Sequence, residues 1–437
     1  MSFLRNVAGL LATSVALVPI GIASNVILAR WLSVEDRGLV SVATTFASTL
    51  LIIGQLGWPT AAVYRLRRIK SPPAAVATAS LIGALLGAGL LLAACVALEP
   101  LLSARLLDGA PAQILFLALS TVPFQIAGAV LGGLARGIDR FALHNTYRIG
   151  SHLGSLCAIA LVLMIGQGGV VEVLTAFVLV QAVGFVIFAG AVLRHTGLSL
   201  EGDLRELLDA TRFGLKSYVQ SLSGKVHEKV DIFMIAYLLS SPEHVAVYTI
   251  AASLVHRLQL VPDAVATAAY PQLAGLPQAQ AARFACRVNR QSLVAVLVTG
   301  VAMAAAVPFI IPLLFGEQYR PSIVPSLILI PGVGLMAIYR VLARYFTALD
   351  RQQANIYTQL ISLSANFGLN LVLIPRYGIQ GAALASLASY GLEAILITAV
   401  FLWTSGCSAR ELFLVRGNDI AALWQRSSGL RARLRLR

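Results

Sequence analysis

The chain has 437 residues, of which 58% are hydrophobic and only 12% are charged. Soluble domains carry about 25% charged residues, so this sequence lacks the polar surface that a soluble globule needs. Lys and Arg number 33 against 19 Asp and Glu, a formal net charge of +14. Such an excess is typical of nucleic-acid binders, but a mean hydropathy of +0.82 excludes that class. We therefore expect a membrane protein without a nucleic-acid partner.

Apolar runs of roughly 18–25 residues recur along the chain, the length of a helix that crosses a hydrocarbon core of about 30 Å. Because a bilayer offers no water to backbone groups, such runs must be helical. The fold class that follows is an all-α polytopic membrane protein with about twelve spans. The expected spans are 7–29, 39–64, 74–98, 114–134, 149–165, 174–193, 217–239, 245–270, 292–315, 323–347, 356–374 and 381–404.

The sequence gives no indication of a signal peptide, a disulfide framework, a metal site or a nucleotide site. The first apolar run is long enough to remain as a span, so it does not resemble a cleavable signal peptide. The four cysteines stand singly along the chain and predict neither a disulfide framework nor a metal site. No phosphate-binding GxxxxGK[ST] loop is present, which argues against ATP hydrolysis by this chain. We assign no cofactor and no catalytic residue.

The basic residues are distributed unevenly between the two sides of the membrane. With the N-terminus placed in the cytoplasm, 23 Lys and Arg fall in cytoplasmic segments and 5 in external ones. By the positive-inside rule this predicts a multi-pass protein of the cytoplasmic (inner) membrane with both termini in the cytoplasm. The basic tail, residues 405–437, is expected to lie on anionic headgroups.

The second half of the sequence repeats features of the first. Leu32-Ser33, with Glu35 shortly after it, recurs 207 positions later as Leu239-Ser240 with Glu243. A Gly-containing turn at 165–169 aligns with 374–378 at a similar offset. Parallel repeats of this kind are typical of transporters, so we expect two six-helix pseudo-repeats around a central cavity. Chance similarity between apolar segments is the alternative.

Four domains follow from this organisation. Residues 203–216, DLRELLDATRFGLK, place Leu and Phe at helical spacing, which predicts an amphipathic helix on the membrane surface between the two halves. The expected boundaries are 1–200 for the N-terminal six-helix lobe, 201–216 for the interfacial linker, 217–404 for the C-terminal lobe and 405–437 for the tail.

Five cations fall inside expected spans: Lys225, Lys229, Arg257, Arg340 and Arg344. A charge at the bilayer centre costs from about 3 to over 10 kcal/mol, so these side chains are not expected to face lipid. Arg344 lies near a span end and is expected to be an interface anchor. We assign the other four, Lys225, Lys229, Arg257 and Arg340, to a substrate-binding cavity. Arg binds phosphate oxygens through paired donors, which favours an anionic substrate.

Each assignment has a structural alternative. Lys225 could snorkel to the cytoplasmic surface, and Arg257 could form an internal ion pair with Asp231 or Asp263. The acids inside the spans, Glu228, Asp231, Asp263 and Glu393, are candidates for titratable groups that couple transport to ions. Asn366 and Asn370 are more typical of hydrogen bonds between helices.

Several segments resemble one family. SNVILARWLSVEDRGLVSVATTFAS at 24–48, LARGIDRFALHNTYRIGSHL at 134–153 and LNLVLIPRYGIQGAALASLASY at 369–390 are similar to oligosaccharide and polysaccharide flippases. These proteins belong to the multidrug/oligosaccharidyl-lipid/polysaccharide (MOP) exporter superfamily. The similar segments occur in the expected order along nearly the whole chain, and the last of them is the most specific.

The resemblance implies a MATE-like fold and a transporter that is not an enzyme. It implies alternating access and a polyprenyl-pyrophosphate-linked oligosaccharide moved for surface polysaccharide biosynthesis. Membrane lipids and polysaccharide polymerase or assembly proteins would be its partners. The family has no shared catalytic motif, so the site residues above rest on their depth in the spans. The chain lacks the two additional helices of peptidoglycan-precursor flippases.

Three other functions remain open. A proton- or sodium-coupled drug or cation antiporter of the same superfamily would depend on the acids inside the spans, and the excess of cations argues against it. A membrane-embedded glycosyl polymerase or ligase would need a large external loop, and none is expected. A scaffold without transport would leave the charges inside the spans unexplained.

Overall fold

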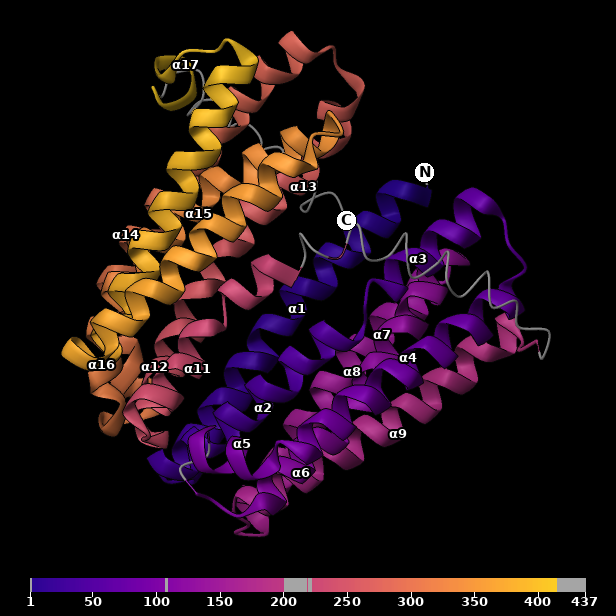
Figure 1. Ribbon diagram of the computed structural model, residues 1–437, viewed down its shortest axis with the longest axis vertical. Coiled ribbons are helices and arrows are strands. Elements are labelled where there is room, and N and C mark those ends of the chain that lie inside the picture. Colours follow the sequence, from indigo (N-terminus) through magenta and orange to yellow (C-terminus); the bar gives the residue numbers. More distant parts are fainter. Residues whose placement is uncertain (1, 107–108, 200–217, 219–221, 415–437) are drawn as a thin grey trace, which may run out of the picture. The chain divides into compact units, whose positions relative to one another are not determined.

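The computed structural model describes residues 2–106, 109–199, 218 and 222–414, and all regular elements in these ranges are helical (Figure 1). Packing divides the chain into two compact units. The first consists of Met1–Thr249 and Leu313–Gln318, and the second of Ile250–Pro312 and Tyr319–Arg437. The expected interfacial helix at 201–216 and most of the tail lie outside the described residues.

The first unit is built from apolar helices joined by short turns. Ser33 begins α2 as its N-cap, because its hydroxyl oxygen accepts a hydrogen bond from the Asp36 backbone N–H at 3.0 Å. The elements are α1 (Ser2–Trp31), α2 (Val34–Gly54), α3 (Trp58–Tyr64), η1 (Arg65–Ile69), α4 (Pro73–Ala97), α5 (Glu99–Leu106), α6 (Ala112–Ser120), α7 (Val122–Gly137), α8 (Phe141–Ala160), η2 (Leu161–Ile165), α9 (Val170–Thr196), α11 (Val230–Leu239) and most of α12 (Pro242–Val255).

The second unit has its core where α13, α14, α15 and α16 meet. The rings of Tyr345, Phe346 and Phe401 pack edge to face there, with centroids 5.0–5.3 Å apart. Such aromatic contacts add to the free energy gained from burying the rings. The elements are the end of α12, η3 (His256–Gln259), α13 (Leu260–Gly275), α14 (Gln278–Phe315, whose last three residues belong to the first unit), η4 (Glu317–Ser322), α15 (Ile323–Ala348), α16 (Gln352–Ser405) and α17 (Ala409–Phe413).

The helices confirm the all-α polytopic fold class. In the described residues, ten helical segments are long and apolar enough to cross a membrane. Two of the twelve expected spans do not appear among them as separate long helices. The run at 217–239 ends in the shorter apolar helix α11, and the last two runs share the 54-residue α16. Gly378, with φ +57°, interrupts α16 between those two runs, a backbone conformation that glycine adopts readily.

The structure interrupts several expected spans, which the sequence did not predict, and two of the interruptions lie at expected site residues. The helix at 222–227 ends in a turn at Glu228-Lys229 before α11 begins. The Lys229 N–H bonds to the Val226 carbonyl at 3.0 Å, three residues back instead of four. The span over 245–270 changes to one 3₁₀ turn, η3, between α12 and α13. Such short 3₁₀ segments often mark functional positions in helices.

Candidate functional site

The break before α11 holds two of the expected site residues in contact with neighbouring helices. The Lys229 ammonium donates a hydrogen bond to the Ser48 hydroxyl on α2. Asp231 is 3% exposed, and one of its carboxylate oxygens accepts a hydrogen bond from the Tyr248 hydroxyl on α12 at 2.6 Å. Both side chains are therefore held by neutral hydroxyl groups.

The packing around this break is close. Phe233 on α11 meets Phe46 on α2 edge to face, with ring centroids 6.3 Å apart. Gly38 on α2 lies against the backbone of Pro242, so that a Cβ at position 38 would collide with the Pro242 carbonyl. Lys225 is exposed and Glu228 is half-buried. Of the four titratable site residues between 225 and 231, Asp231 is the most deeply buried.

The second site lies where η3 packs against α15, inside the second unit. The Arg340 guanidinium donates a hydrogen bond to the Gln259 side-chain oxygen at 2.7 Å, and another of its nitrogens lies 3.6 Å from an Asp263 carboxylate oxygen. The Gln259 amide in turn lies 3.4 Å from the Met336 sulfur. Arg340 is thus fixed from both η3 and α13, with its side chain 29% exposed.

Arg257 lies two residues before Gln259 on η3 and is half-buried. The ion pair considered as its alternative role would use Asp231 or Asp263. The structure joins Asp231 to Tyr248 and Asp263 to Arg340, and neither of these contacts involves Arg257. The role of Arg257 in binding a substrate anion stays a prediction.

Glu393 is 1% exposed on α16, close to a buried polar network that connects the two arms of that helix. The Asn366 amide donates to the Ser389 hydroxyl at 3.2 Å, and the Asn370 amide donates to the Asn366 side-chain oxygen at 3.0 Å. The Ser362 hydroxyl bonds to the Ser389 carbonyl at 2.6 Å. The prediction of a hydrogen bond between helical segments is confirmed for Asn366, whereas the bond of Asn370 to Asn366 lies within one helical segment.

The sequence analysis did not single out Arg37, a cation that the structure buries. Arg37, on the first turn of α2, is 3% exposed and donates hydrogen bonds to the Asn25 side chain at 2.6 Å and the Ser41 hydroxyl at 2.9 Å. Arg37 is one of the five Lys and Arg that the charge distribution assigns to external segments. The Ser33–Asp36 capping pattern was the available signal, because it places the start of the helix before Arg37.

The four expected cavity cations are divided between the two units, with Lys225 and Lys229 in the first and Arg257 and Arg340 in the second. Arg344, expected to be an interface anchor, is exposed, and its guanidinium carbon lies 6.0 Å from the Tyr270 ring centroid. Among the described residues, no cluster of three or more His, Cys, Asp or Glu side chains could hold a metal ion.

The fold places the chain in a known structural class. It is similar to an inward-facing multidrug resistance MATE family transporter of the MOP superfamily, with a TM-score of 0.71, 17% identity and coverage of 89% of this chain and 94% of that one. It is also similar to the lipid II flippase MurJ in an inward closed conformation, with a TM-score of 0.72, 13% identity and coverage of 92% and 88%. At these identities the likeness establishes the fold alone.

The family is shown by the sequence. Residues 3–276, more than half of the chain, match the polysaccharide biosynthesis protein family, and the chain belongs to that family. This confirms the resemblance found in the sequence.

Two relatives come from Haloferax volcanii. "Probable flippase AglR" is 27% identical over 292 residues, covering 64% of this chain and 58% of AglR. "Probable low-salt glycan biosynthesis flippase Agl15" is 23% identical over 192 residues, covering 41% of this chain and 39% of Agl15. The matches thus span less than two thirds of either relative.

Proposed function

We propose that this protein flips a polyprenyl-pyrophosphate-linked oligosaccharide across the cytoplasmic membrane for surface polysaccharide biosynthesis, by alternating access. The observation that carries the proposal is the pair of arginines at η3 and α15, Arg257 and Arg340, inside spanning helices of a polysaccharide biosynthesis protein. The names of AglR and Agl15 as flippases support the same activity.

The chemistry of these arginines suits a pyrophosphate. A guanidinium is charged at every physiological pH, and its planar donors match pairs of phosphate oxygens. Such a group inside a spanning segment can replace part of the water that a dianion loses when it leaves the surface. Arg340 is oriented by Gln259 and Asp263, so that little side-chain entropy remains to be lost on binding.

Breaks in spanning helices supply further groups for the anion. Half-helix ends expose backbone N–H groups and local dipoles, and transporters build their substrate sites from such discontinuous helices. Lys229 lies at the break before α11, and Arg257 lies within η3. In this proposal Lys225, Lys229, Arg257 and Arg340 bind the anionic head, and the sugars follow through an aqueous cavity.

In this proposal the acidic residues inside the spans couple transport to the movement of ions. Asp231 and Glu393 are 3% and 1% exposed, and acids buried in spanning segments are typical of proton relays. The same observation favours the second candidate function, a proton- or sodium-coupled drug or cation antiporter. The antiporter would bind a cationic substrate at these acids and would have no need for Arg257.

Reconstitution distinguishes the two candidates. Purified protein in liposomes receives either a lipid-linked oligosaccharide with a fluorescent sugar or a cationic dye, and a membrane-impermeant quencher reports the movement. We expect movement of the lipid-linked oligosaccharide and no pH-driven movement of the dye. Dye transport without oligosaccharide transport would overturn the proposal.

The Arg257→Ala variant tests the role of this arginine in the same liposome assay. It should lower oligosaccharide movement at least about tenfold, the effect of losing one hydrogen bond to a charged group, and Arg257→Lys should restore part of it. The control is Arg287→Ala, which removes an exposed arginine from the start of α14. In cells, Arg257→Ala should reduce surface polysaccharide and accumulate the lipid-linked repeat unit. Normal polysaccharide at normal expression would exclude the assigned role of Arg257.

A further inference from the structure

An apolar groove of about 500 Å³ runs along the contact between α8 and α9, two spanning helices that lie side by side in the first unit (Figure 1). Its volume falls in the range of sites that hold small molecules. Its lining is apolar apart from the hydroxyl-bearing side chains of Thr146, Tyr147 and Ser151. None of the residues assigned to the substrate head belongs to it.

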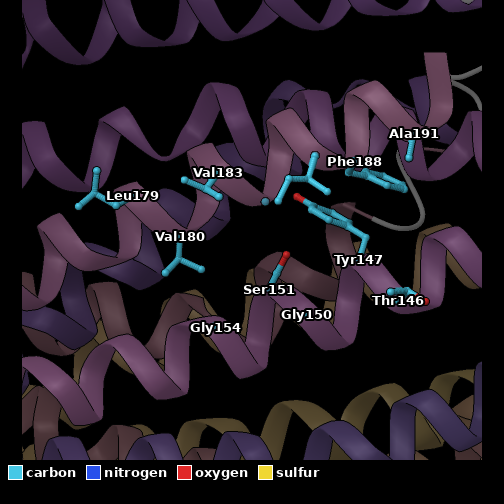
Figure 2. Close-up of a pocket in the computed structure, with 12 residues that line it drawn as sticks. Thr146, Tyr147, Gly150, Ser151, Gly154, Leu179, Val180, Val183, Phe188 and Ala191 are labelled. Carbon is cyan, nitrogen blue, oxygen red and sulfur yellow. The ribbon is translucent and has the colours of Figure 1, made fainter. Parts of the chain in front are cut away.

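Glycines make room for the groove. Gly150, Gly154 and Gly184 line it, and a Cβ added to Gly150 would meet no atom within 4 Å. Figure 2 shows Leu179, Val180 and Val183 on one helix facing Gly150, Ser151 and Gly154 on the other. The rings of Tyr147 and Phe188 stack with centroids 4.2 Å apart and planes within 4° of parallel. The flat surface of the two stacked rings therefore lies beside the open groove between the two helices.

The groove has the length of one lipid leaflet. Along α8 it extends from Thr146 to Gly154, and along α9 from Leu179 to Ala191. At 1.5 Å per residue these stretches are about 12 and 18 Å long, close to half of a hydrocarbon core of about 30 Å. Leu179, Val183 and Ile187 are 58–69% exposed along it, so a chain-like molecule could enter from the side.

One end of the groove is basic. The end at Thr146 and Ala191 is flanked by Arg140, the N-cap residue of α8, and by Arg194 and His195 in the last turn of α9. The sequence of α8 contains no acidic residue, and the single acid of α9, Glu172, lies in its first turn, at the opposite end. An apolar channel with cations at one end is complementary to an amphiphile that has one long hydrocarbon tail and an anionic head.

We propose that this groove binds the polyprenyl chain of the lipid-linked substrate in the cytoplasmic leaflet when the substrate first enters, with the phosphate head toward Arg140 and Arg194, before the head moves to the cations assigned above. The proposal rests on the proposed function. The positive-inside rule makes the arginine-bearing end the cytoplasmic one, where such a substrate is made available. The open space at Gly150 leaves room for a methyl branch of an isoprenoid chain, which a straight acyl chain does not need.

Photolabelling tests the site. The full-length protein in lipid nanodiscs is irradiated with a polyprenyl phosphate that carries a diazirine on its hydrocarbon chain, and labelled peptides are mapped by mass spectrometry. We expect labels on the exposed rim residues Leu179, Val183 and Ile187. Excess unlabelled polyprenyl phosphate should remove the labels, and the same excess of phosphatidylglycerol should not. Equal competition by phosphatidylglycerol would identify a general lipid surface and overturn the proposal.

Gly150→Leu fills the groove without a backbone collision, because the space at its Cβ is open. It should lower labelling about tenfold, the effect of removing the apolar contacts of roughly two methylene groups. Gly184→Leu is the second variant. The matched control is Gly89→Leu on α4, an exposed glycine with equally open space outside the groove. Unchanged labelling in both groove variants, or an equal loss in the control, would contradict the proposal.

The transport assay separates this inference from the function on which it rests. A wild-type protein that moves no lipid-linked oligosaccharide would overturn the proposed function. Wild-type transport that is retained at full rate in Gly150→Leu and Gly184→Leu would overturn the groove assignment and leave the proposed function standing.

Discussion

The break before α11 and the break at η3 both hold a basic residue within a spanning segment, but their charges have different partners. At the first break, the Ser48 hydroxyl holds Lys229, and the Tyr248 hydroxyl holds Asp231. At the second, Arg340 lies beside the carboxylate of Asp263 and the amide of Gln259. The carboxylate beside Arg340 partly offsets its charge, whereas the hydrogen bonds described at the first break come from neutral hydroxyl groups.

This difference bears on which basic side chain supplies positive charge to a substrate in each region. An ion pair with side chains 29% and 44% exposed contributes about 0–1 kcal/mol, so Asp263 orients Arg340 more than it stabilises the fold. With Arg340 paired in this way, we expect Arg257 to supply positive charge to a substrate near η3. In the first unit, Lys229 has that role at the α11 break.

The largest effect is expected for Arg340→Met. The change removes a cation with two oriented contacts, and one hydrogen bond to a charged group contributes about 1.5–3 kcal/mol. Oligosaccharide movement should therefore fall roughly 10–150-fold, as measured by the liposome quenching assay. Arg344→Met, one turn further along α15 and exposed, is the control and should lose less than about threefold. Equal losses would mean that Arg340 contributes no more to transport than its exposed neighbour.

A smaller effect is expected for Lys229→Met. Because Lys229 is held by a single hydroxyl, its loss should slow transport about tenfold. Ser48→Ala keeps the ammonium and removes only its partner, so it should slow transport by about threefold at most. The two variants are compared in the same liposome assay. A larger loss for Ser48→Ala than for Lys229→Met would show that the hydroxyl, and not the charge, is required at this break.

Tyr248→Phe tests how the buried acid is held. The variant removes the hydroxyl that donates to Asp231 and should destabilise the protein by about 1 kcal/mol. Thermal unfolding in detergent, followed by tryptophan fluorescence, measures the change. Tyr357→Phe, at a tyrosine that is 65% exposed, should leave the unfolding temperature unaltered. An unaltered temperature for Tyr248→Phe as well would mean that Asp231 does not depend on this hydroxyl.

The smallest effect is expected for Asp263→Asn. The pair with Arg340 is partly exposed, so stability should change by less than about 1 kcal/mol. Removing the carboxylate leaves Arg340 without its counter-charge, so the substrate concentration at half-maximal transport should fall about twofold at low salt. Salt near 1 M shortens the Debye length to about 3 Å, so it should screen the attraction between Arg340 and the substrate and abolish the difference. A rise in that concentration would instead assign Asp263 to substrate binding.

The sequence predicted the helical segments far better than their interruptions. Hydropathy is a sum over neighbouring residues, and it located the apolar runs that became α1 to α16. The turn at Glu228-Lys229 and the 3₁₀ segment η3 depend on a few backbone hydrogen bonds, to which a hydropathy window is insensitive. Gly378, in contrast, lies in the turn-like segment at 374–378 that the repeat comparison had singled out.

The candidate site was predictable as a set of residues but not as a set of contacts. Depth in the spans identified Lys229, Arg257 and Arg340, because charges there are costly. Their partners are far away in sequence: Ser48 precedes Lys229 by 181 residues, and Gln259 precedes Arg340 by 81. No local pattern connects such positions. Arg37 was misplaced for a related reason, since its burial depends on Asn25 of the preceding helix.

The sequence by itself determined that this is an all-α, multi-pass membrane protein of the polysaccharide biosynthesis family, because apolar run length, composition and family motifs are properties of the linear chain. Only the tertiary structure decided which cations are offset by acids, where spanning helices are interrupted, and that α8 and α9 enclose an apolar groove. These features arise from side chains on separate helices, and their energies depend on distance and burial, which the order of residues alone does not specify.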